Sequence, residues 1–146
     1  MAPVRLTRFA QVREALETLG PSLPATAGPR LAHCAQSIEC SLTGYPQPRA
    51  WLIRTFIGPR VLARFLKRGV MSHDVNAGIG GLDDPPATLT LSQGRERLLQ
   101  AMEAFERHSG PLAPHFAYGP VERGEYEAVH SMHVADHLTA LVALPK

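Results

Sequence analysis

Apolar residues recur every three or four positions over four long stretches of the chain, which is the spacing of an amphipathic helix. Thr7 is the expected N-cap of the first helix, which ends at Gly20-Pro21. Pro29 suits the first turn of the second helix, and Gly44 ends it. The two N-terminal stretches therefore predict two helices joined by a short linker.

The C-terminal half repeats this pattern. Ser92 is the expected N-cap of a helix that ends near Gly110, and a last helix is predicted over residues 125–144. Between the two halves, residues 49–68 are also helical in composition. Gly58-Pro59 interrupts this segment, which predicts either a kink or two short helices.

Glycine and proline are frequent in residues 69–91, which predicts a long loop with a short extended piece at 88–91. Loops of this length in compact domains are often functional. The elements together predict an all-α fold. We expect one domain over residues 1–146, an up-down four-helix bundle with an extra short helix at the proline break.

Composition narrows the classes of protein. The chain has 146 residues, of which 45% are hydrophobic, so a single core is feasible. No apolar run reaches the length of a membrane span, and the N-terminus lacks the apolar segment of a secretory signal.

Cys34 and Cys40 are six positions apart on one predicted helix, a poor geometry for a disulfide. We expect two reduced thiols in a cytoplasmic protein.

Three of the seven histidines, His130, His133 and His137, fall at spacings of three and four in the last predicted helix. Those spacings place them on one helical face, where a His-x-x-x-His pair can hold a divalent metal. A zincin protease is not expected, because Val134 stands where that motif has glutamate. His33 is the best candidate for a ligand from another helix. The residues alone leave two sets open: His33 with His133 and His137, or a set that includes His130.

Several segments resemble the DinB/YfiT-like superfamily of metal-binding four-helix bundles, and in particular a branch of uncharacterised bacterial domains. The resembling residues are Leu31-Ala32-His33-Cys34-Ala35-Gln36-Ser37-Ile38-Glu39, His115-Phe116-Ala117-Tyr118-Gly119, Glu125-Tyr126 and His133-Val134-Ala135-Asp136-His137-Leu138. The order and separation of these segments agree with the superfamily over nearly the whole chain.

The resemblance implies a ligand set. One superfamily histidine comes from the second helix and two come from the last, which carries over to His33, His133 and His137; His130 is then a neighbour of the site or a core residue. Members look like metal-dependent enzymes, several of them transferases or isomerases that use a low-molecular-weight thiol. The chain departs from the superfamily at Asp136, where a histidine is common, and at Thr139-Ala140, where the branch often has Arg-Gln.

Five polar side chains are candidates to lie beside the metal: Gln36, Ser37, His115, His130 and Asp136. Asp136 either orients an imidazole or is a solvated carboxylate. His115 either closes over the site or is exposed in its loop. His73 and His108 are expected on the surface.

Three functions follow from these observations. The first is a metal-dependent transferase or hydrolase that acts on a small molecule, with Zn²⁺ or Ni²⁺ and a low-molecular-weight thiol. The second is a non-catalytic binding or structural protein stabilised by the metal. The third is a basic nucleic-acid-associated domain, suggested by the arginines of 49–68, although the net charge of +2 is too small to argue for such a partner by itself and nucleic acid is not the favoured partner. No membrane partner is expected, and a homodimer stays open.

Overall fold

The computed structural model describes residues 2–144, and in this range the chain is helical with no β-strand. The α-helices are α1 (Phe9–Leu19), α2 (Gly28–Thr43), α3 (Gly58–Arg68), α4 (Leu91–Arg107) and α5 (Arg123–Val142). Short 3-10 turns at Gly20–Ser22 and Ala25–Ala27 join α1 to α2, and a π-helical turn at Ile53–Ile57 precedes α3. The predicted all-α class is confirmed.

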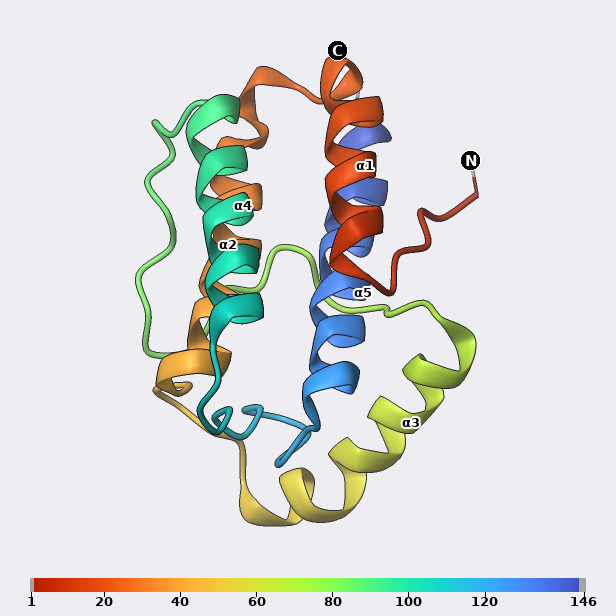
Figure 1. Cartoon of the computed structure of the whole chain (residues 1–146), viewed down its shortest axis with the longest axis vertical. Coiled ribbons are helices and arrows are strands. Elements are labelled where there is room, and N and C mark those ends of the chain that lie inside the picture. The colour runs from red at the N-terminus through yellow and green to blue at the C-terminus, as the bar shows by residue number, and fades with distance from the viewer. Residues whose placement is uncertain (1, 145–146) are drawn as a thin grey trace.

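Helices α1, α2, α4 and α5 form a bundle, in which α2 and α4 run in the same direction (Figure 1). Gly28, at the start of α2, touches Gly94 near the start of α4: a Cβ on Gly94 would lie 2.1 Å from the Gly28 carbonyl oxygen. The long connection over 44–90 carries the chain back to the same end of the bundle. The helix directions therefore do not alternate strictly along the chain.

The predicted apolar stripes face one another in the core. The buried side chains include Phe9, Val12 and Leu16 of α1, Leu31 and Ile38 of α2, Leu98, Met102 and Phe105 of α4, and Tyr126 and Leu138 of α5. Phe9 and Phe105 meet edge to face with ring centroids 5.4 Å apart. Burying side chains of this size contributes about 1.5–3 kcal/mol each, so this core is the main source of stability.

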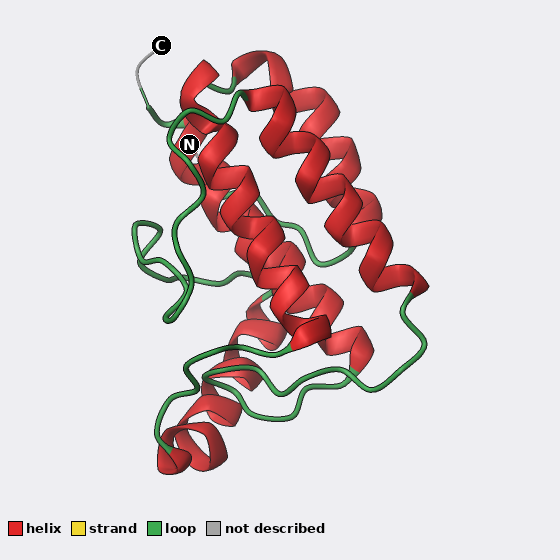
Figure 2. Ribbon diagram, turned by 90° about the vertical axis from the view of Figure 1, so that its left-hand side faces the viewer, coloured by secondary structure: helices red, strands yellow, loops and turns green. Residues whose placement is uncertain are grey.

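Helix α3 lies at one end of the molecule, outside the four-helix bundle (Figure 2). A second, smaller core holds it to α5 through Leu62, Met71, Tyr118, Val129 and Met132. The chain stays helical through the Gly58-Pro59 position, which fits a kink rather than two separated helices. Gly58 is required there, because a Cβ would lie 1.9 Å from the Ala117 carbonyl oxygen.

Two predicted N-caps are wrong. Arg8 rather than Thr7 is the N-cap of α1, and the Gln11 side chain accepts hydrogen bonds from the backbone N–H groups of both residues. Thr90 rather than Ser92 caps α4: Thr90 Oγ1 accepts from the N–H of Gln93, whose side chain accepts from the N–H of Thr90.

The extended piece expected at 88–91 is absent from the described chain, because the capping box already starts α4 at Leu91. Both cysteines, Cys34 and Cys40, are free and buried, as expected. Among the helices of residues 2–144, none combines the length and the apolarity needed to cross a membrane.

Candidate metal centre

The structure brings together the three histidines that the resemblance implies. His33 comes from the middle of α2, and His133 and His137 lie one turn apart on the facing side of α5. One ring nitrogen from each lies within 4.8 Å of those of the other two. The Nε2 atoms of His133 and His137 are 3.1 Å apart, and the His33 ring centroid lies 5.2 and 5.0 Å from theirs. The i, i+4 spacing on α5 therefore aims two imidazoles at one point, which α2 meets from the other side.

His130 belongs to the core instead. Its ring is 1% exposed and stacks on Tyr126, with centroids 5.1 Å apart. Its Nε2 lies 3.0 Å from Ser41 Oγ, and this hydroxyl donates its own proton to the Ile38 carbonyl oxygen. His130 Nε2 must therefore be the donor to Ser41, and the alternative histidine set that includes His130 is not assembled.

The three clustered imidazoles are neutral near pH 7. Burial lowers the pKa of His33 and that of His133, and it lowers the pKa of His137 to about 3; the neighbouring histidines act in the same direction. Neutral imidazoles keep the lone pairs that bind a metal. A buried set of imidazole donors suits Zn²⁺ or Ni²⁺. The residues present therefore fit a divalent metal.

A fourth histidine joins the cluster from the long loop. His73 Nε2 lies 3.2 Å from His137 Nε2, and the His73 ring centroid lies 4.7 Å from that of His133. The other ring nitrogen, Nδ1, lies 2.6 Å from Asp136 Oδ2, and the backbone N–H of His73 also donates to that oxygen. The expectation that His73 is a surface residue is wrong. Its loop follows no periodic pattern, so the one signal in the sequence was the unusual length of the loop.

Two polar neighbours on α2 serve different purposes. The side-chain amide of Gln36 donates to the Asp83 carbonyl oxygen at 2.9 Å. Ser37 is buried, and its carbonyl oxygen accepts a hydrogen bond from the Tyr45 hydroxyl at 3.0 Å. Gln36 therefore fastens the long loop to α2, while Ser37 remains beside the cluster.

His115 is buried rather than exposed in its loop. Its ring is 6% exposed and stacks on Tyr118 with centroids 4.2 Å apart. Its Nδ1 accepts hydrogen bonds from the backbone N–H groups of Ala117 and Tyr118. The expectation of an exposed His115 is wrong, because the ring packs on Tyr118 and accepts backbone hydrogen bonds that shape the connector before α5.

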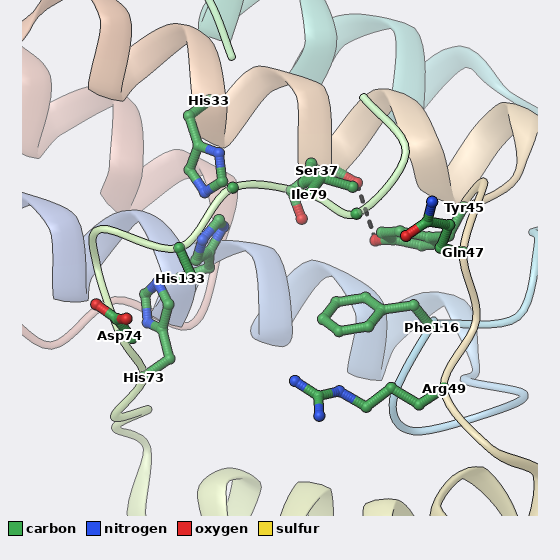
Figure 3. Close-up of a pocket in the computed structure, with 13 residues that line it drawn as sticks. His33, Ser37, Tyr45, Gln47, Arg49, His73, Asp74, Ile79, Phe116 and His133 are labelled. Atoms are coloured by element: carbon green, nitrogen blue, oxygen red, sulfur yellow. Dashed lines mark hydrogen bonds between the residues drawn. The ribbon is translucent and has the colours of Figure 1, made fainter. Parts of the chain in front are cut away.

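A cavity of about 220 Å³ opens beside the cluster (Figure 3). His33, His73 and His133 face it from one side. The remaining lining side chains come from the end of α2, the segment after it, the long loop and the connector before α5: Ser37, Tyr45, Gln47, Arg49, Asp74, Ala77, Gly78, Ile79, Gly80 and Phe116. Small molecules can therefore reach the imidazoles without disturbing the bundle.

Cys34 does not contribute a thiolate. It is completely buried in the apolar core of the bundle, and burial raises the pKa of its thiol.

A comparison with protein-family models identifies the family of this chain. The model of one family, described as "Protein of unknown function (DUF1569)", matches residues 26–144, a range that contains α2 to α5 and all four clustered histidines. Comparisons with curated proteins and with solved structures find no match. The chain belongs to the DUF1569 family.

Proposed function

We propose that this protein is a metal-dependent enzyme related to the DinB/YfiT-like bundles, with His33, His133 and His137 as ligands of Zn²⁺ or Ni²⁺. The observation that carries the proposal is the convergence of three neutral imidazoles, two of which, His33 and His133, line a cavity. Structural zinc sites are usually closed by four protein ligands, whereas catalytic sites keep a position for water or substrate. Three histidine ligands, two of them exposed to a cavity, match the second arrangement.

The reaction class we propose is thiol-dependent transfer or hydrolysis. A bound divalent cation would lower the pKa of a water or a thiol beside it. Arg49 supplies positive charge to the cavity, and its guanidinium carbon lies 5.9 Å from the Phe116 ring centroid. This pair would hold a small anionic group, such as the carboxylate of a low-molecular-weight thiol, next to a flat apolar surface.

Metal analysis of purified protein tests the ligand set. We expect about one Zn²⁺ or Ni²⁺ per wild-type chain, and loss of the metal in His33→Ala and His133→Ala. His130→Ala is the matched control, because His130 lies one turn from His133 on α5 but bonds to Ser41. This control should retain most of the metal. Wild-type protein with less than about one metal per ten chains, and no gain on adding Zn²⁺ or Ni²⁺, would refute the site.

A non-catalytic role has one specific observation in its favour. The proposed ligands come from two different helices, α2 and α5, so a metal would clamp them together as a structural staple. Cobalt(II) substitution separates the two functions. If adding a small thiol produces a sulfur-to-cobalt charge-transfer band, the metal is accessible and the enzyme is favoured. If saturating thiol leaves the spectrum unchanged, the staple is favoured.

A further inference from the structure

His33 and His73 lie on opposite sides of the His133/His137 pair. The His33 ring is 5.2 and 5.0 Å from the rings of that pair, and the His73 ring is 4.7 and 4.9 Å from them. Figure 3 shows His133 between His33 and His73. We propose that His73 is a fourth imidazole ligand of the metal, positioned by Asp136. This inference rests on the proposed metal site but not on the proposed catalysis.

The nitrogen separations are those of ligands that share one ion. Two nitrogens bound at about 2.0–2.1 Å lie about 2.9–3.4 Å apart when the angle at the metal is between a right angle and the tetrahedral value. The Nε2 atoms of His73 and His137 are 3.2 Å apart, and those of His137 and His133 are 3.1 Å apart. Each of these two separations therefore suits a pair of neighbouring ligands on one metal.

Asp136 sets which nitrogen of His73 is available. Nδ1 lies 2.6 Å from the carboxylate oxygen, so a proton on Nδ1 removes the repulsion between their lone pairs and this tautomer is favoured. A neutral ring then has its lone pair on Nε2, which is the atom that faces His137. A carboxylate behind a histidine is the usual way in which proteins fix the tautomer and orientation of a metal ligand.

The loop is fastened to the two helices that supply the other ligands. Arg30, on α2, donates to the Val75 carbonyl oxygen and to the Asn76 side chain. Gln36, also on α2, donates to the Asp83 carbonyl oxygen, and Asp136 on α5 accepts the N–H of His73. The position of His73 is thus set by contacts to the frame of the site, as preorganised coordination requires.

A fourth imidazole changes the character of the centre. His73 faces the cavity, so it would occupy the position through which a substrate approaches. A four-coordinate ion accepts a further ligand only by expanding to five positions or by releasing one that it has. His73 is the ligand on a loop, whereas the other three are on helices, and it is therefore the one that exchanges.

Titration with Co²⁺ alone tests the proposal, with visible absorption and chelator competition as readouts. In His73→Ala we expect a changed absorption spectrum and an affinity lower by about tenfold or more, since loss of an outer partner alone costs that much. Added imidazole should restore the wild-type spectrum by filling the vacated position. Asp136→Asn should lower the affinity about tenfold and keep a four-nitrogen spectrum.

His108→Ala is the matched control, because His108 lies outside the cluster and contacts the Pro111 carbonyl oxygen. It should bind cobalt as the wild type does. Wild-type affinity and spectrum in His73→Ala would overturn the fourth ligand alone and leave the three-histidine site intact. Failure of imidazole to restore the spectrum would also count against His73 as a ligand. Wild-type protein that binds no cobalt would overturn the metal site itself.

Discussion

His130 makes the stability of the metal-free protein depend on pH in a predictable direction. Burial lowers the pKa of His130 to about 3, and the nearby His115 acts in the same direction. In the unfolded chain a histidine has a pKa of about 6.5. As the pH falls below that value, His130 becomes protonated in the unfolded chain but stays neutral in the folded chain. The stabilising contribution of neutral His130 is therefore complete above pH 6.5 and is lost as the pH falls toward 3.

The size of the effect follows from the two pKa values. Between pH 8 and pH 5, protonation of one such histidine in the unfolded state lowers the free energy of unfolding by about 2 kcal/mol. Burial also lowers the pKa of His115 to about 3, which adds a loss of similar size in the same direction. Burial also lowers the pKa values of His33, His133 and His137, so these rings act in the same direction when no metal is present and the total pH dependence is steep.

Urea unfolding at pH 8 and pH 5, in the presence of a chelator, measures the contribution of His130. Glutamine does not titrate, and its side-chain amide can donate to Ser41 as His130 does. We expect the free energy of unfolding of His130→Gln to fall by about 2 kcal/mol less than that of the wild type between the two pH values. All other titrating groups cancel in this difference. Equal losses in the two proteins would refute the assignment of His130 as a buried neutral ring.

Three further predictions concern the frame of the bundle and the metal. Gly94→Ala should lower the free energy of unfolding by about 3 kcal/mol, because its Cβ would lie 2.1 Å from the Gly28 carbonyl oxygen. The control Gly124→Ala should be neutral or slightly stabilising, because a Cβ there would have nothing within 4 Å. Equal effects of the two substitutions would contradict the close packing of Gly94. Thr90→Ala should cost about 1 kcal/mol in urea unfolding by removing the hydroxyl that caps the Gln93 N–H, and an unchanged midpoint would argue against the capping box. Zn²⁺ or Ni²⁺ at about a hundred times its Kd should raise the Tm by about 5–10 °C over chelator-treated protein, and a Tm independent of metal would count against binding to the folded state.

The sequence is most informative where a periodic structure repeats its pattern. The spacing of Phe9, Val12 and Leu16 indicates which face of α1 is buried. The spacing of His133 and His137 likewise indicates that both rings lie on one side of α5. His33 could be joined to that pair through the resemblance to a family, since periodicity does not report which face of α2 meets α5.

The features that escaped prediction depend on contacts between distant segments. His73 is placed by bonds from α2 and α5 to an irregular loop, and a loop has no repeating pattern that reveals its path. His115 was misjudged because its partners are the backbone N–H groups of its own turn. The shared direction of α2 and α4 depends on the contact between Gly28 and Gly94, which are 66 positions apart in the numbering (94 − 28).

The separation of the four histidines along the chain bears on when the cluster can form during synthesis. His73 and His137 are 64 positions apart, and His33 comes earlier still. On the ribosome, α2 and the long loop emerge well before α5. The histidines of a nascent chain therefore stay apart until α5 is released. The histidine nitrogens come together only when the whole bundle folds. Any metal uptake at this cluster would consequently follow translation and depend on the completed tertiary structure.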